Sequence, residues 1–384
     1  MLVKLLKRIN AWLHLWLGLA SGIIVVILGL TGCVLVFEQE IKSLSSPWLH
    51  VEQPAGGNYL PPSVLYQAVK KALPHKEINS VWYHGADKTA HFSLNSDSMV
   101  YVNPYTAEIV AMVDHEDFFH EVDEGHRHLW LPEKIGRQVV GWATFIFFLL
   151  LITGLILWWP KNLRKSNLDK SLKIKWRAKF KRLNYDLHNV LGFYSLLIAL
   201  LMAITGLVMS FSWFNKSVYW LSGGDSSQAR PIEEIYEPGL LPIHENVDLV
   251  WRKVQDEYAV YRKNEIIISF PKESNEPIYA CTDMINGHWR DLYFKQSDLS
   301  LTSNTMPEMK DLPFADQVRK LNFTMHVGAF GGLWIKGIYF IVSLICASLP
   351  ITGFYVWWGK RKKLQKKSRR PKDESKLISA QAQS

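Results

Sequence analysis

Four long apolar runs alternate with polar segments along the 384-residue chain. A helix needs about 20 apolar residues to cross a bilayer, and each run reaches that length. The pattern therefore predicts four transmembrane helices, at Trp12–Phe37, Val139–Trp159, His188–Phe214 and Ile335–Trp358. The first run is too long for the core of a signal peptide, and no small-residue cleavage site follows it, so we interpret it as a retained anchor.

The polar segments after the first and third runs have the pattern of small α+β domains. Helical spacing follows Pro62 and Val247, over Pro62–Leu73 and Val247–Tyr258. Alternating apolar and polar residues predict strands. These lie near Ser80–Tyr83, His91–Leu94, Met99–Val102 and Glu108–Val113, then near Glu265–Phe270, Ile278–Cys281 and Leu292–Phe294, with a hairpin-type turn at Asn286-Gly287. Neither segment carries a nucleophile–base motif, a zinc-ligand spacing or a nucleotide-binding glycine loop.

The basic residues predict the topology. Of the net charge of +9, most comes from lysines and arginines before the first run, in the 160–184 loop and after the fourth run. The positive-inside rule places these segments, and both termini, in the cytoplasm. Because the basic residues flank the spans, we favour a lipid bilayer over nucleic acid as their partner. The paired Trp158-Trp159 and Trp357-Trp358 fit interfacial anchors.

The predicted fold is an integral membrane protein, mainly α, with four transmembrane helices in two pseudo-repeated halves and two small periplasmic α+β domains. Its predicted parts are the N-terminus with the first helix (1–38), a first periplasmic domain (39–136), the second helix (137–160), a basic cytoplasmic loop (161–184), the third helix (185–214), a second periplasmic domain (215–325), the fourth helix (326–359) and a basic cytoplasmic tail (360–384).

Two motifs occur twice. R-I-N-x-x-L-H-x-x-L-G at Arg8–Gly18 is nearly repeated as R-L-N-x-x-L-H-x-x-L-G at Arg182–Gly192, and each copy is followed by Thr-Gly. T-G-x-x-x-W-W begins at both Thr153 and Thr352. Spans one and three run in the same direction, so the halves are expected to be related by an axis along the membrane normal. This arrangement would bring His14 and His188 face to face.

A histidine inside a membrane helix is costly and indicates a functional site. An interfacial histidine is the alternative for a lone residue, but the repeat favours His14 and His188 as metal ligands. Gly18 and Gly192 lie one turn further on the same helix faces. A glycine there leaves room for a flat macrocycle, although glycines also permit close helix packing.

A second histidine pair is expected toward the other membrane face. The spacing from His326 to Thr352 falls between the spacings from His126 and from His128 to Thr153, so spacing leaves the choice between these two open. A rise of 1.5 Å per residue separates His14 from Thr31 by about 25 Å, which puts the two pairs near opposite faces.

Four imidazoles in two pairs suit two six-coordinate, bis-histidine haems. The spans lack the carboxylates that magnesium, manganese or di-iron sites need, while copper or zinc remains an alternative. The chain has no C-x-x-C-H, so any haem would not be held by that covalent attachment. Four cations lie near the proposed ligands and either pair with haem propionates or are ordinary flanking charges: Arg8, Arg182, Arg137 and Lys336.

The chain resembles the PepSY-associated transmembrane family over nearly its whole length. The matching features are L-H-x-x-L-G with Thr-Gly, H-R-x-L-x-L…G-R at His126–Arg137, and T-G-x-x-x-W-W. The segment Val100–Val110 is similar to the strand–turn–strand of a PepSY domain, with Ala107 where glycine is usual. In that family the histidine before the arginine of H-R-x-L recurs, which favours His126 over His128.

The resemblance implies a ferric-siderophore reductase of the bacterial inner membrane with two b-type haems. Electrons would cross the membrane to a periplasmic ferric siderophore and release Fe(II). The chain shows no flavin or nicotinamide motif, so a membrane quinol or a separate protein is the expected donor. The alternative is a non-redox membrane protein whose PepSY-like domains bind a peptide or a peptidase, or a siderophore transporter.

Overall fold

The computed structural model describes residues 2–95, 98–114, 117–160, 162, 164–225, 235–259, 265–284 and 290–368. The predicted turn at Asn286-Gly287 lies outside them. The chain forms two compact units. We call Met1–Cys33, Gly125–Ser210 and Gly337–Ser384 the helical unit, and Val34–Glu124 with Phe211–Lys336 the sheet unit.

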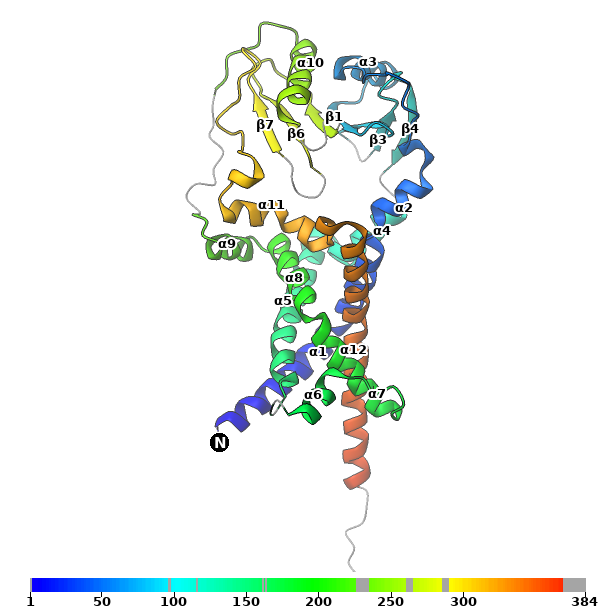
Figure 1. Ribbon diagram of the computed structural model, residues 1–384, viewed down its shortest axis with the longest axis vertical. Helices are drawn as coiled ribbons and strands as arrows, with labels where there is room; N and C mark the ends of the chain where they lie inside the picture. The colour runs from blue at the N-terminus through cyan, green and yellow to red at the C-terminus, as the bar shows by residue number, and fades with distance from the viewer. Residues whose placement is uncertain are drawn as a thin grey trace, which may run out of the picture. The chain divides into compact units, whose positions relative to one another are not determined.

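The helical unit contains the predicted spans. Its long helices, α1 (Leu2–Leu35), α5 (Glu133–Trp158), α8 (Gly192–Ser210) and α12 (Gly332–Ser368), lie alongside one another (Figure 1). In the third span, α7 (Phe180–Asp186) and a π-helical turn, η2 (Leu187–Leu191), lead into α8. All four spans are confirmed as helices long and apolar enough to cross a membrane. Large apolar side chains such as Ile23 and Leu197 are more than three-quarters exposed, as expected of a surface that faces lipid.

The third span ends earlier than predicted. Helix α8 stops at Ser210, Phe211 adopts an extended backbone, and the separate helix α9 (Ser212–Leu221) begins at the next residue. Apolar residues continue through this break, so hydrophobicity alone extended the span to Phe214. Further short helices are α2 (Glu38–Ser45), α4 (Phe118–His128), α6 (Lys165–Leu172) and α11 (Phe314–Val327).

The sheet unit is built on one seven-stranded antiparallel sheet in the order β4-β3-β2-β1-β5-β6-β7. The strands are β1 (Ile78–His84), β2 (Ala90–Leu94), β3 (Ser98–Val102), β4 (Ile109–Asp114), β5 (Glu265–Ser269), β6 (Ile278–Thr282) and β7 (Arg290–Phe294). Every strand predicted from the alternating pattern is present.

The two predicted α+β domains share this sheet instead of folding as separate domains. Strand β1 of the first segment pairs with β5 of the second, with Val81 opposite Ile268. Alone, each segment would leave β1 or β5 as an edge strand with a row of unpaired backbone groups. Pairing the two edges satisfies those groups, which is why two similar segments form one sheet.

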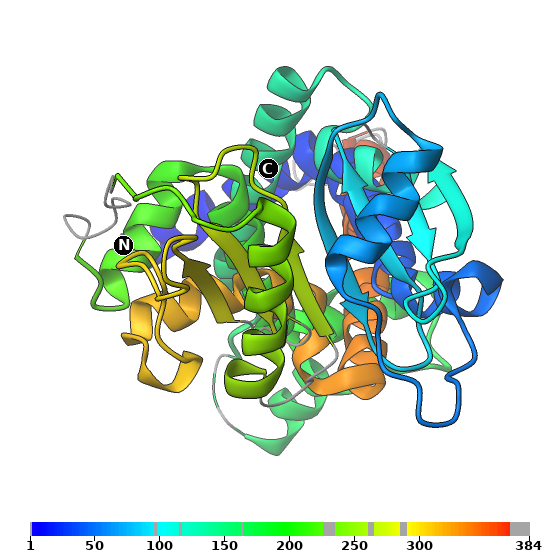
Figure 2. The same cartoon turned by 90° about the horizontal axis from the view of Figure 1, so that it is seen from above.

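One face of the sheet is covered by α3 (Pro62–Ala72) and α10 (Ile243–Lys253), one helix from each segment (Figure 2). The largest fully buried side chains of this core include Phe92 and Phe294. The helices are joined to each other by Asp248, whose carboxylate accepts hydrogen bonds from the backbone N and Oγ of Ser63 at 2.9 and 2.6 Å. The duplicated segments therefore share a core as well as a sheet.

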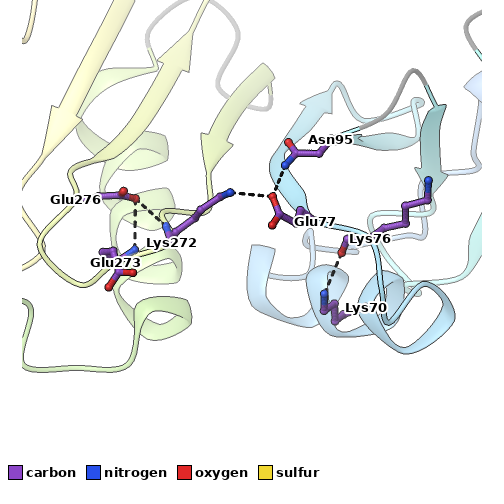
Figure 3. Close-up of polar contacts among 7 residues, drawn as sticks. All are labelled: Lys70, Lys76, Glu77, Asn95, Lys272, Glu273 and Glu276. Atoms are coloured by element: carbon purple, nitrogen blue, oxygen red, sulfur yellow. Dashed lines mark hydrogen bonds and ion pairs between the residues drawn. The ribbon is translucent and has the colours of Figure 1, made fainter.

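A surface contact also joins the two segments (Figure 3). Lys272 Nζ lies 2.8 Å from Glu77 Oε2, and Asn95 donates a second hydrogen bond to the same carboxylate. The ammonium of Lys272 lowers the pKa of Glu77. Both side chains of the ion pair are more than half exposed, so solvent screening keeps its contribution to stability small.

Ala107 and Leu299 occupy corresponding left-handed turns in the two segments. Their φ angles are 61° and 58°. Ala107 follows β3 and Leu299 follows β7. Each donates its backbone N–H to the carbonyl oxygen four residues back, that of Asn103 or of Lys295 respectively. Glycine adopts this conformation without the steric cost that a Cβ introduces, which explains why glycine is the expected residue at Ala107.

Candidate cofactor site in the helical unit

His14 and His188 lie opposite each other in the helical unit. Their ring centroids are 6.4 Å apart and the ring planes are nearly perpendicular, at 85°. Both rings line a cavity of about 410 Å³ between α1, α5, η2, α8 and α12. Its walls are mainly apolar and aromatic, and they include Gly18 and Gly192, as the sequence predicts.

Each imidazole is hydrogen-bonded to the threonine of a Thr-Gly pair on a neighbouring helix. His14 Nδ1 lies 2.9 Å from Thr153 Oγ1, and His188 Nδ1 lies 3.0 Å from Thr352 Oγ1. Each hydroxyl donates its own proton to a backbone carbonyl one turn back, at 2.9 Å to Leu149 O and 3.0 Å to Ser348 O. The hydroxyl therefore accepts from the imidazole, so Nδ1 carries the hydrogen and Nε2 carries the free lone pair.

The ring separation fits one metal ion between two imidazoles. With a metal–nitrogen bond of about 2.0 Å and about 1.2 Å from each nitrogen to its ring centroid, two imidazoles that held one metal ion between them would have centroids about 6.4 Å apart. The observed separation is 6.4 Å. A neutral imidazole whose other nitrogen donates to a fixed acceptor is the usual form of a histidine ligand.

Glycines allow this approach. A Cβ at Gly154 would lie 3.1 Å from His14 Cε1, and one at Gly353 would lie 3.2 Å from His188 Cε1. The Thr-Gly pairs are recognisable in the sequence as repeats, but their contact with the histidines was not predicted. Their recurrence in the second and fourth spans, at matched positions, is the signal that pointed to them.

The tryptophans of the two T-G-x-x-x-W-W motifs divide between two environments. Trp158 and Trp357 line the cavity, and the Trp158 ring stacks on Phe193 with centroids 3.6 Å apart. Trp159 and Trp358 are 66% and 42% exposed. Only the second tryptophan of each pair therefore has the exposure expected of an interfacial anchor.

His126 has the same kind of partner in a third Thr-Gly pair. Its Nδ1 lies 2.9 Å from Thr31 Oγ1, whose hydroxyl donates to Ile27 O at 2.8 Å. A Cβ at Gly32 would lie 3.5 Å from the His126 ring. His128 is buried, and its backbone packs against Gly136. His326 lies on α11, in the sheet unit.

Three of the four cations proposed to pair with haem propionates contact other protein groups. Arg137 Nη2 donates to Met209 O at 2.9 Å, and Lys336 Nζ lies 2.7 Å from Glu40 Oε1. Arg182 pairs with the fully buried Asp186, at 2.8 Å from Nη2 to Oδ1. These contacts favour a structural use of the charges.

The whole-chain comparison agrees with this architecture. The family described as PepSY-associated TM region matches residues 11–360. No curated protein matches the chain. The match includes the three Thr-Gly pairs described above, and the four long helices make the chain a multi-pass membrane protein. Because the matched region covers most of its length, the chain belongs to the PepSY-associated transmembrane-region family.

Proposed function

We propose that this protein is a haem-containing reductase of the bacterial inner membrane that passes electrons across the membrane to a periplasmic ferric siderophore and releases Fe(II). The observation that carries the proposal is the pair of neutral imidazoles, His14 and His188, set 6.4 Å apart across an apolar cavity.

The residues around the cavity suit a flat macrocycle. A volume of about 410 Å³ lies within the usual range for cofactor sites. Gly18 and Gly192 keep side chains away from the space beside the two ligands, and the walls are mainly apolar and aromatic. A haem held by two imidazoles would supply reversible one-electron chemistry. The chain's own part is to hold both Nε2 atoms as ligands and to keep the site dry.

A second b-type haem is proposed at His126 and His326. His126 is supported by its hydrogen bond to Thr31, which repeats the arrangement around His14 and His188. His326 is proposed from its spacing in the sequence, and His128 is the alternative to His126. The two haems would lie near opposite faces of the membrane, as a path for electrons across it requires.

The direction of transfer follows from the predicted topology, with the basic loop and both termini in the cytoplasm. Electrons would come from a membrane quinol or a separate donor protein at the His14–His188 end. Reduction to Fe(II) weakens a chelate of hard oxygen ligands and frees the metal. Inner-membrane location, donor and acceptor are all parts of this proposal.

Optical spectra of the purified protein test the proposal. We expect a Soret band of low-spin haem that shifts on reduction with dithionite. Addition of a ferric siderophore to the reduced protein should reoxidise the haem and release Fe(II), detected with a ferrous-specific chelator. Protein that lacks haem after expression with ample haem supply would contradict the proposal, and peptide binding by such protein would support the non-redox alternative.

A further inference from the structure

An asparagine stands four residues before both His14 and His188, and the two asparagines make the same contact. Asn10 Nδ2 donates to Thr153 O at 3.0 Å, and Asn184 Nδ2 donates to Thr352 O at 2.9 Å. These are the same threonines whose hydroxyls accept from His14 and His188. In each half, therefore, one threonine receives two hydrogen bonds from the facing helix segment.

Two contacts to one residue restrict the ligand more than one contact does. A single hydrogen bond at Nδ1 leaves the helix that carries the histidine free to slide or rotate around that bond. The asparagine sits one helical turn away on the same face, so its bond to the threonine carbonyl fixes a second point. Together the two bonds set the depth and direction of the imidazole.

The alternative is that the asparagines only join helices, as interhelical polar side chains commonly do in membranes. The internal repeat argues for a more specific role. Between asparagine and histidine the two copies differ at two of three positions, with Ala11 and Trp12 in one copy and Tyr185 and Asp186 in the other. The asparagine, its acceptor and the distance are the same in both copies.

We infer that Asn10 and Asn184 are positioning residues that hold the imidazoles of His14 and His188 in opposition for haem ligation. This inference rests on the proposed function. The asparagines touch neither the reacting atoms nor the ligand nitrogens, and they act through Thr153 and Thr352. The spacing N-x-x-x-H occurs again at Asn322 and His326, which extends the same expectation to a third ligand.

The test uses the full-length protein in detergent, with Asn10 and Asn184 both changed to alanine or both to leucine. Leucine has nearly the size and branching of asparagine, but it has no group that can donate to the threonine carbonyl. Loss of an outer-shell partner of a metal ligand typically weakens metal binding by about 10- to 100-fold. We expect haem retention to fall by that factor in both double variants, with a high-spin signal in the electron paramagnetic resonance spectrum.

Two substitutions serve as matched controls. Ser195→Ala removes a buried hydroxyl that bonds only within α8 at 3.3 Å, and Thr144→Val removes a hydroxyl bonded to its own helix in α5 at 2.9 Å. Both should keep the wild-type spectrum and haem content.

The outcomes separate the two proposals. Wild-type protein without haem overturns the proposed function and this inference with it. Wild-type protein with haem, together with asparagine variants that match the controls in haem retention and spin state, overturns this inference alone. If only the alanine variants lose haem, the asparagines act by packing, and positioning by hydrogen bonding is overturned.

Discussion

The two copies of the ligand segment agree at the asparagine, the histidine and the glycine, and they differ at other positions, including the cavity-lining pair Ala11 and Tyr185. His14 and His188 contact equivalent threonines and glycines at nearly equal distances. Yet His14 lies in a regular α-helix, whereas His188 lies in the π-helical turn η2. Two residues before the histidine, the first copy has Trp12, 60% exposed, and the second has Asp186, fully buried.

This difference shows which positions the site constrains. In the second copy, Asp186 accepts hydrogen bonds from Arg182 Nε at 3.0 Å and from the backbone N of Lys175 at 3.3 Å. These contacts tie the basic loop to the base of the third span. In this copy the histidine lies within a π-helical turn, a feature that often marks a functional site. Different surroundings thus lead to the same ligand geometry.

The largest expected effect comes from removing both copies of the ligand. His14→Ala with His188→Ala should remove one haem equivalent and leave the other, because the second haem is proposed at other histidines. Haem quantified per chain by the pyridine haemochrome method measures this. His75→Ala, at an exposed position of the sheet unit, is the control. Loss of both equivalents from folded protein would contradict two independent sites.

A smaller loss of haem affinity, equal in the two halves, is expected when the glycines that face the histidines are replaced by alanine. Gly154→Ala and Gly353→Ala place a methyl group 3.1 and 3.2 Å from a histidine ring and should displace it. We expect about a 10-fold loss of haem affinity in each, at the lower end of the range for disturbed ligand surroundings. Haem titration of apo-protein measures the loss.

Gly337→Ala is the control for this pair. Gly337 lies on α12, as Gly353 does, and a methyl group there would meet no atom within 4 Å. A loss confined to one half would show that the two copies do not constrain their ligands equally.

In the sheet unit the halves are expected to differ in their response to acid. Burial, with Lys88 nearby, lowers the pKa of His84 to about 4, and its Nε2 lies 2.7 Å from Nδ1 of His91. The unfolded value is about 6.5, so between pH 6.5 and pH 4 the unfolded chain binds a proton that the folded chain refuses. Stability should therefore fall with decreasing pH in this window, by at most about 3 kcal/mol.

Urea unfolding of the full-length protein at pH 7 and pH 4.5 measures this loss, and His84→Gln should reduce it. The register of the sheet places Tyr279 of the second half where the first half has His91. An acid response unchanged by His84→Gln would place the titrating group elsewhere.

The smallest effect concerns the left-handed turns. Ala107→Gly should raise the free energy of unfolding by about 1 kcal/mol, because glycine has no Cβ to strain this backbone. Leu299→Gly relieves the same strain but removes a side chain packed against the core, which costs about 2 kcal/mol. Thermal unfolding should thus show opposite signs for the two variants. Stabilisation by both variants would mean that backbone strain dominates in both halves, and destabilisation by Ala107→Gly would contradict the strain.

The sequence predicted the local elements of the fold better than their partners. The period of apolar residues located four spans and seven strands, because side-chain periodicity follows local backbone geometry. The pairing of β1 with β5 depends on contacts between segments far apart in the chain, which no local pattern records. The break at Phe211 was missed because apolar residues continue through it.

The site was predicted at the level of its repeated residues. His14, His188, Gly18 and Gly192 were identified from spacing, and the structure brings all four to one cavity. The roles of Asn10, Asn184 and the Thr-Gly pairs required the facing helices, since each contact joins segments that are distant in the sequence. Spacing left the choice between His126 and His128 open and the family pattern favoured His126, while the hydrogen bond of His126 to Thr31 is visible only in the structure.

The joint between β1 and β5 has a consequence for how the protein is made. During synthesis, the first half of the chain emerges with four strands and with β1 as an open edge, well before β5 exists. Such an edge can pair with any other extended chain, including a second nascent copy. The nascent protein is thus most vulnerable to misassembly while the second half is still on the ribosome, and a pause in that interval lengthens the exposure.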